Sequence, residues 1–147
     1  MIELINRYGK LPRNVTAKGV KRVIRRALRG SKERNKYLCA LLVSDAGIKR
    51  LNRKYFGKNR PTDVIAFPMD DRELLGDIAL SIDAAKRQCG DFGNSADEEV
   101  LTLAVHGVLH LLGYDDIREE DARTMRERTN RILAECAGGG GKWKKRK

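Results

Sequence analysis

A stretch in the last third of the chain is apolar on nearly every side of the helix that it predicts, and this feature most constrains the fold. A helix without a polar face is stable only when other elements cover it all round. The sequence of a capping box, from Ser95 to Glu98, opens the helix, and Gly113 offers a place for it to end. The apolar side chains are Val100, Leu101, Leu103, Ala104, Val105, Val108, Leu109, Leu111 and Leu112. We therefore expect this helix to form the centre of the core.

Two histidines, His106 and His110, interrupt this apolar surface, and they are the only histidines in the chain. Residues four positions apart share one face of a helix, so both imidazoles can bind one divalent ion, as in H-x-x-x-H zinc motifs. Asp115 and Asp116 follow the turn and offer carboxylate oxygens. The alternative is a pair of core histidines, each of which would need its own hydrogen-bond partner. The pattern favours a His-His-Asp zinc site with an open coordination position.

The same residues resemble the signature of the YbeY family of endoribonucleases, H-G-x-L-H-L-x-G-Y-D-H, which here runs from His106 to Asp116. Residues 61–68 are similar to the family block P-T-D-V-L-S-F-P, and residues 76–81 to G-D-I-x-I-S. The resemblance implies a metal-dependent, single-strand-specific endoribonuclease. It also implies a role in rRNA maturation (16S rRNA 3′-end processing) and ribosome quality control, with rRNA and ribosomal subunits as partners.

Asp116 stands where the family has its third histidine ligand. Carboxylate oxygen is an accepted zinc ligand. The resemblance therefore implies that His106, His110 and Asp116 hold one zinc ion per chain. Asp115 is either a partner for a histidine N–H or a turn residue.

A second departure lies before the P-T-D block, where Phe56 stands in place of an arginine that the family tends to carry. Lys58 and Arg60 lie close by in the sequence and are RNA-binding candidates. Asp63 and Asp77 fall in the family blocks, and each either lies near the metal or caps a turn. No residue is identified as the catalytic acid or base.

The net charge of +11 is unevenly distributed along the chain. Residues 1–60 carry 18 basic and 3 acidic side chains, residues 61–125 carry 5 and 15, and residues 126–147 carry 8 and 2. Basic flanks beside an acidic, metal-bearing middle suit a protein that holds a polyanion and cuts it at a cation. Arg22, Arg25 and Arg26 lie on the polar side of a predicted helix and are further RNA-binding candidates, the alternative being a solvated surface.

Zinc would lower the pKa of a bound water to about 7, so either metal-activated water or the ribose 2′-OH could attack a phosphodiester. Zinc metalloproteases share the histidine spacing but carry a Glu directly after the first His. Gly107 occupies that position and provides no base, which favours RNA over peptide. A non-catalytic rRNA-binding factor with a structural metal is the remaining alternative.

The sequence predicts an α+β fold: a small mixed sheet of about four strands packed with about five helices, of which the buried metal-binding helix is the central one. One domain is expected over residues 1–137, followed by a Gly-linked basic tail, 138–147, that either contacts RNA or serves as a solubilising end. Hydrophobic patterning and capping signals give the elements. The expected strands are 2–6, 37–43, 64–67 and 77–82, and the expected helices are 14–29, 44–56, 83–90, 95–112 and 118–137.

The chain is expected to be cytoplasmic. It has no apolar run of membrane-spanning length, and residues 1–10 lack a signal-peptide pattern. Three cysteines without C-x-x-C spacing argue against a disulfide framework or a thiolate zinc site. Cys39 and Cys136 fall at apolar positions and are expected to be buried, reduced thiols.

Overall fold

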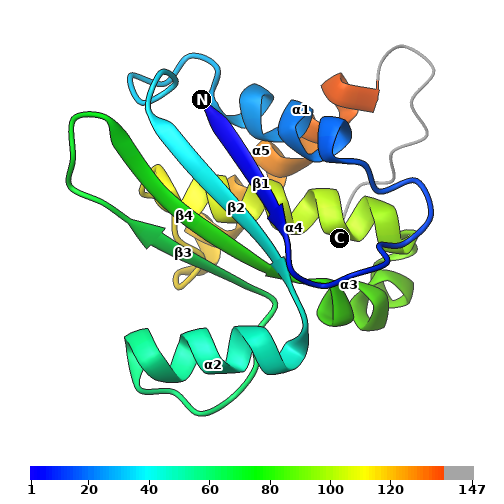
Figure 1. The fold of residues 1–147 in the computed structure, drawn as a ribbon. Coiled ribbons are helices and arrows are strands. Elements are labelled where there is room, and N and C mark those ends of the chain that lie inside the picture. The colour runs from blue at the N-terminus through cyan, green and yellow to red at the C-terminus, as the bar shows by residue number, and fades with distance from the viewer. Residues whose placement is uncertain (138–147) are drawn as a thin grey trace.

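A four-stranded mixed sheet runs through the molecule, as shown by the computed structural model, which describes residues 1–137 (Figure 1). The order of the strands is β1-β2-β4-β3. The central strand β2 pairs in parallel with β1 and β4, whereas β3 is antiparallel to β4. The strands are β1 (Ile2–Asn6), β2 (Tyr37–Val43), β3 (Val64–Pro68) and β4 (Leu74–Ser81). The expected α+β fold is confirmed.

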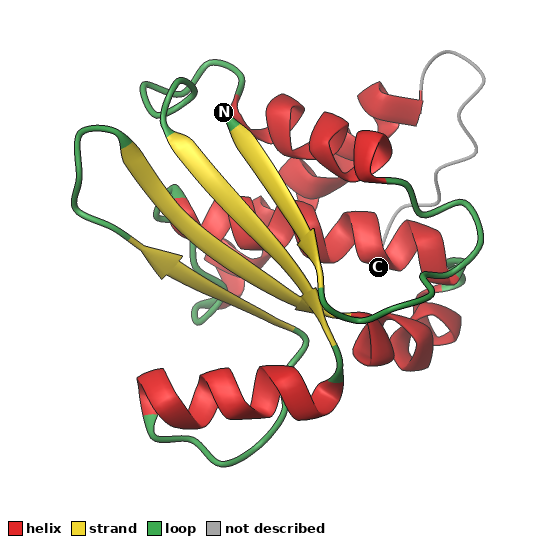
Figure 2. Cartoon of the chain, viewed as in Figure 1, coloured by secondary structure: helices red, strands yellow, loops and turns green. Residues whose placement is uncertain are grey.

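Helices cover both faces of this sheet, but unequally (Figure 2). Four α-helices lie on one face and α2 alone lies on the other, so the molecule has a large core and a small one. Successive side chains of β4 point to opposite faces of the sheet. Ile78 and Leu80 therefore belong to the large core and Ala79 to the small one. The helices are α1 (Ala17–Leu28), α2 (Asp45–Phe56), α3 (Ile82–Gln88), α4 (Ala96–Leu111) and α5 (Glu119–Ala137), with a 3₁₀ turn at Cys89–Phe92. The expected basic tail falls outside the described residues.

Helix α4 is the central element of the large core, as its all-round apolar surface predicts. It packs against β3 and β4 on one side and against α1, α3 and α5 on the others. Its first turn carries the predicted capping box: the Ser95 hydroxyl accepts from the Glu98 N–H, and the Glu98 carboxylate accepts from the Ser95 N–H at 2.8 Å. The sequence therefore fixes both the start of this helix and its burial.

The start of β4 and the burial of Tyr55 differ from the sequence expectation. Strand β4 begins at Leu74 rather than at residue 77, because the Asp71 carboxylate accepts from the Glu73 and Leu74 N–H groups and turns the chain directly into the strand. The apolar pattern of residues 44–56 places Tyr55 on the inward side of the helix, but in the structure Tyr55 is 56% exposed. Its ring packs edge-on against Phe67 at a part of the sheet that α2 does not fully cover.

The described residues contain no helix that is both long enough and apolar enough to cross a membrane. The three cysteines are unpaired thiols. Cys39 is buried in β2, as expected. Cys136 is only half-buried, because its position near the end of α5 borders a surface pocket.

Gly76 is the glycine of the G-D-I block, and both its backbone conformation and its close neighbours exclude a side chain at this position. Its φ is +145°, a conformation that L-residues rarely adopt. A Cβ at this position would collide with the Phe67 carbonyl oxygen across the antiparallel ladder, and it would lie 2.9 Å from the Leu111 Cδ2 atom. Gly76 therefore allows β3, β4 and the end of α4 to meet.

We expect Gly76→Ala to reduce the free energy of unfolding by about 2–4 kcal/mol, because backbone strain and overpacking both act at this position. Urea denaturation measures the change. Gly90→Ala is the matched control, since no atom lies within 4 Å of the Cβ that it would add. Equal effects of the two substitutions would contradict this account of Gly76.

Candidate metal and RNA site

A cleft of about 800 Å³ lies where the C-terminal end of α4 meets β3. It joins one of the predicted metal ligands, His110, to two of the predicted RNA-binding residues, Lys58 and Arg60. The other lining residues are Asn52, Phe56, Pro61, Thr62, Val64, Ile65, Ala66, Pro68 and Ile117. The structure therefore brings together residues that are fifty positions apart in the sequence, with two cations beside an imidazole.

The imidazole of His110 is oriented by the turn that ends α4. Its Nδ1 atom lies 3.1 Å from the carbonyl oxygen of Tyr114. A carbonyl oxygen only accepts, so Nδ1 is the donor of this hydrogen bond, and in the neutral imidazole Nε2 then carries the lone pair that a metal ion needs. The turn itself is held by hydrogen bonds from the Gly113 N–H to the His110 carbonyl and from the Tyr114 N–H to the Leu109 carbonyl. His110 thus fits the role of a metal ligand.

His106 is half-buried one helical turn before His110. Gly107, between the two, packs against the sheet: a Cβ there would lie 3.0 Å from Ile78 Cγ2 and 3.2 Å from Val64 Cγ2. The absence of a side chain allows α4 to approach the sheet closely. A glutamate at this position would meet Ile78 in the core, which is incompatible with the arrangement of a zinc protease.

Asp116 is exposed in the segment between α4 and α5. The adjacent Ile117 lines the cleft, so this segment borders the site. Within residues 1–137, however, no three His, Cys, Asp or Glu side chains are grouped closely enough to hold a metal ion. The structure therefore does not bring Asp116 together with both histidines, and its ligand role stays a prediction. The Asp115 carboxylate accepts from the Ile117 N–H at 3.3 Å, as a turn residue would.

The two aspartates of the family blocks lie outside the residues that line the cleft. Asp63 accepts from the Val64 N–H at 2.8 Å, and Gln88 donates to it at 3.4 Å. Asp77 borders an apolar pocket on the face covered by α2. Burial raises the pKa of its carboxyl, and the nearby charge of Glu3 raises it further. The sequence did not predict this environment, because it arises from cross-strand neighbours.

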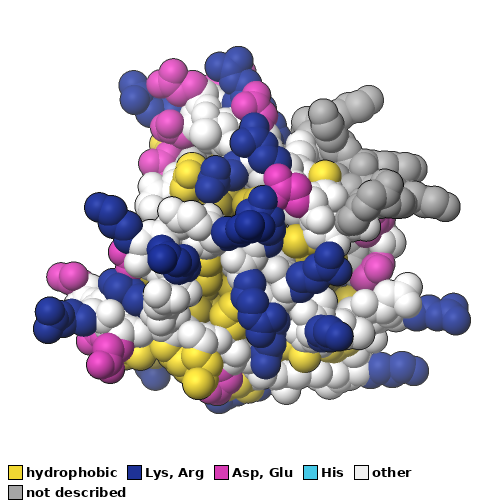
Figure 3. Space-filling view, turned by 90° about the horizontal axis from the view of Figure 1, so that it is seen from above, with side chains coloured by type: hydrophobic (Ala, Val, Ile, Leu, Met, Phe, Trp, Pro, Cys, Tyr) yellow, Lys and Arg dark blue, Asp and Glu magenta, His cyan; other side chains and the backbone are white. Residues whose placement is uncertain are grey.

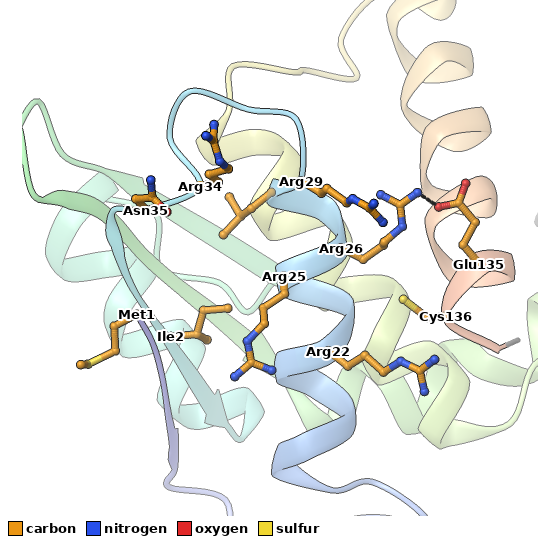
Figure 4. A pocket seen from close by; sticks show the side chains of 11 residues that line it. Met1, Ile2, Arg22, Arg25, Arg26, Arg29, Arg34, Asn35, Glu135 and Cys136 are labelled. Carbon is orange, nitrogen blue, oxygen red and sulfur yellow. Dashed lines mark ion pairs between the residues drawn. The ribbon is translucent and has the colours of Figure 1, made fainter.

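The predicted RNA-binding arginines of α1 line a second pocket, of about 880 Å³ (Figure 4). Arg22, Arg25 and Arg26 project from the helix, and Arg26 pairs with Glu135 of α5. The pocket also contains Arg29, and Arg34 joins it from the loop before β2. No sequence pattern predicted that Arg34 would join this pocket, because only the folded loop before β2 places it near α1.

This arginine pocket and the histidine cleft lie at opposite edges of the sheet. Met1 and Ile2 at the β1 edge line the pocket, whereas Val64 and Ala66 of β3 line the cleft. Lys and Arg side chains are spread over the face on which α1 lies (Figure 3). Among the arginines that line the pocket, Arg26 alone forms an ion pair within the described residues.

The fold and the site define an α+β protein in which a buried helix carries two histidines one turn apart and places the second of them, His110, in a cleft with Lys58 and Arg60. A match to the family described as "Endoribonuclease YbeY" covers residues 3–137. The chain belongs to the YbeY family, and the resemblance seen in its three motif blocks is confirmed.

Individual relatives agree with this assignment. The "Endoribonuclease YbeY" of Sulfurihydrogenibium sp. is 38% identical over 138 residues, which cover 88% of this chain and 89% of the relative. That of Carboxydothermus hydrogenoformans is 48% identical over 96 residues, which cover 63% and 67%. The solution structure of TM1509 from Thermotoga maritima matches with a TM-score of 0.65 at 26% identity, and covers 94% of this chain and 90% of that one.

Asp77→Asn is expected to raise the melting temperature at pH 7. The folded state raises the pKa of Asp77 above its ordinary value of 3.8, so ionisation costs more in the folded chain than in the unfolded chain. Stability is therefore lost as the pH rises through the raised pKa, and the amide avoids this loss. Below the ordinary pKa, the Asp77 carboxyl is neutral in both the folded and the unfolded state, so the amide gives no advantage there. Melting curves at about pH 3 and pH 7 should show a gain only at the higher pH; an equal gain at both would contradict the role of ionisation.

Proposed function

We propose that this protein is a metal-dependent endoribonuclease that cleaves single-stranded RNA in rRNA maturation. One observation carries the proposal: the cleft contains His110, whose Nδ1 is held by the Tyr114 carbonyl, together with the cations Lys58 and Arg60. Membership of the YbeY family, whose relatives are named endoribonucleases, supports the same activity. The proposed setting is the cytoplasm, with 16S rRNA 3′-end processing and ribosome quality control on ribosomal subunits as the biological role.

In this proposal His106, His110 and Asp116 hold one zinc ion. Bound zinc supplies Lewis-acid chemistry and a water of lowered pKa. The hydrogen bond to the Tyr114 carbonyl keeps His110 in the tautomer that binds metal. Movement of the exposed segment that carries Asp116 would be needed to complete the ligand set.

Lys58 and Arg60 bind the phosphates on either side of the scissile bond. The segment that carries them is anchored, because the side-chain amide of the buried Asn52 donates to the Arg60 carbonyl at 3.0 Å. Arg60 provides the planar, bidentate donor that suits phosphate. We propose that it compensates for the family arginine whose place Phe56 takes.

The α1 arginines extend the RNA-binding surface beyond the cleft. Arg22 and Arg25 have no ion-pair partner within residues 1–137, so their charge is available to a polyanion. Contacts of this kind bind phosphates irrespective of sequence. RNA that occupies the cleft would contact these arginines through a flanking segment.

A second candidate function is a non-catalytic rRNA-binding factor. Two observations favour it: the described side chains do not group into a three-ligand metal site, and Phe56 replaces the family arginine. Peptide hydrolysis has less support, because Gly107 faces Ile78 and the sheet.

The proposal predicts that a chelator abolishes cleavage of a single-stranded rRNA fragment and that zinc restores it. His110→Ala should lose both the bound zinc and the activity while its circular dichroism spectrum is unchanged. Asp116→Ala should weaken zinc binding by at least about tenfold and Asp116→His should retain it, since either oxygen or nitrogen can serve as a ligand. Metal analysis and a gel-based cleavage assay measure these effects.

Asp115→Ala is the matched control for Asp116, and Arg60→Ala tests the compensating arginine. Loss of zinc in Asp115→Ala but not in Asp116→Ala would reassign the ligand. Full activity of Arg60→Ala would remove Arg60 from the mechanism. Zinc-loaded wild type that binds rRNA without cutting it would establish the second candidate, and cleavage of casein would indicate a protease.

The double variant Arg22→Glu/Arg25→Glu should weaken binding to single-stranded RNA of any sequence by about tenfold and reduce the salt dependence, because fewer counterions are released. Lys49→Glu/Arg50→Glu on α2 changes the charge equally on residues that line neither space. Binding titrations at several salt concentrations compare the two variants. If both variants have the same affinity and the same salt dependence, the location of the charge is irrelevant, and the arginines of α1 form only a solvated surface.

A further inference from the structure

Two aromatic side chains at the end of α2 are exposed to solvent. Phe56 is 50% exposed and Tyr55 is 56% exposed. The Phe56 ring stacks on Phe67 of β3, with centroids 5.7 Å apart and an angle of 17° between the rings. Phe67 thereby supports one face of the Phe56 ring, while Phe56 as a residue remains half-exposed to solvent.

Phe56 lies at the boundary between two surface features. It lines the histidine cleft together with His110, Lys58 and Arg60, and it also lines the apolar pocket that contains Tyr55 and Phe67. Its position is fixed by the helix end that follows: Gly57 adopts a φ of +67°, and its N–H donates to the Arg53 carbonyl. This turn leads the chain directly from the aromatic ring to Lys58. An open aromatic ring and two cations therefore border one cleft.

The charges around Phe56 indicate the chemistry of its partner. Arg53, Lys54, Lys58 and Arg60 are exposed neighbours of Phe56 in the sequence. Among the described residues that line the cleft or the apolar pocket, Asp77 is the one carboxylate, and it lines the apolar pocket rather than the cleft. A second copy of this chain would bring the same positive charges together and be repelled. The surface instead fits a polyanion that also carries flat apolar rings.

We propose that Phe56 is a base-stacking residue: an unpaired base packs on its open ring surface while Lys58 and Arg60 bind the adjacent phosphates. Single-stranded nucleic acids combine these two chemistries, and stacking on aromatic side chains with cations along the backbone is how proteins bind them. The proposal rests on RNA as the substrate of the proposed function. It makes Phe56 a determinant of the preference for single strands, because bases in a duplex have no free face.

The test compares matched substitutions in equilibrium binding of a fluorescent single-stranded RNA of about ten nucleotides. Phe56→Leu keeps an apolar side chain but removes the ring, and should weaken binding about tenfold. Tyr55→Leu makes a similar change at a ring that does not line the cleft, and should leave affinity unchanged. Phe56→Trp should retain affinity, and RNA binding should quench its indole fluorescence more than that of wild type, whose one tryptophan is Trp143. Binding to a duplex of the same sequence should not distinguish the variants.

Equal affinity of wild type and Phe56→Leu for single-stranded RNA would overturn the stacking role and leave the proposed function intact. An equal loss for single-stranded and duplex RNA would also overturn it, because the effect would then be a general one on the cleft. Failure of wild type to bind any RNA would instead overturn the proposed function together with this inference. Self-association of wild type in sedimentation that Phe56→Leu abolishes would also overturn the proposal, because the aromatic surface would then be an interface between copies.

Discussion

The close contact of α4 with the sheet at Gly107 is the constraint on which the rest of the structure depends. A side chain at this position would press on Ile78 and Val64, so the helix axis can lie near the sheet only with glycine there. Because α1, α3 and α5 pack on the remaining sides of α4, its position determines theirs. The same contact determines which face of α4 is turned to the β3 edge. Core packing and site geometry are therefore set by one helix, and a change that moves α4 affects both.

Elements with a strong local signal could be predicted from the sequence. Strands β1 and β2 match their expected bounds, because continuous or alternating apolar runs end at clear polar turns. The capping box places the start of α4, and the Ser44 cap places that of α2. The start of β4 and the exposure of Tyr55 could not be predicted. They depend on a turn made by Asp71 and on how much of the sheet α2 covers.

The candidate site shows the same division. That His106 and His110 lie one turn apart on α4 follows from helical spacing, and the position of Lys58 and Arg60 in the cleft of His110 agrees with their proximity to a family block. Tertiary contacts decide the rest. The Tyr114 carbonyl that orients His110, the contribution of Arg34 to the arginine pocket and the surroundings of Asp77 all depend on segments that only folding brings together. The sequence does not encode these contacts in any local pattern.

The two edge strands, β1 and β3, are also the strands beside which the basic side chains gather. An open sheet edge presents unpaired N–H and C=O groups that can pair with another chain and start aggregation. Flanking positive charge opposes the approach of a second copy, and Pro68 removes a donor at the end of β3. The cations at these edges thus also protect the free chain from association through its own strands. A bound polyanion would neutralise that repulsion while it covers the edges itself.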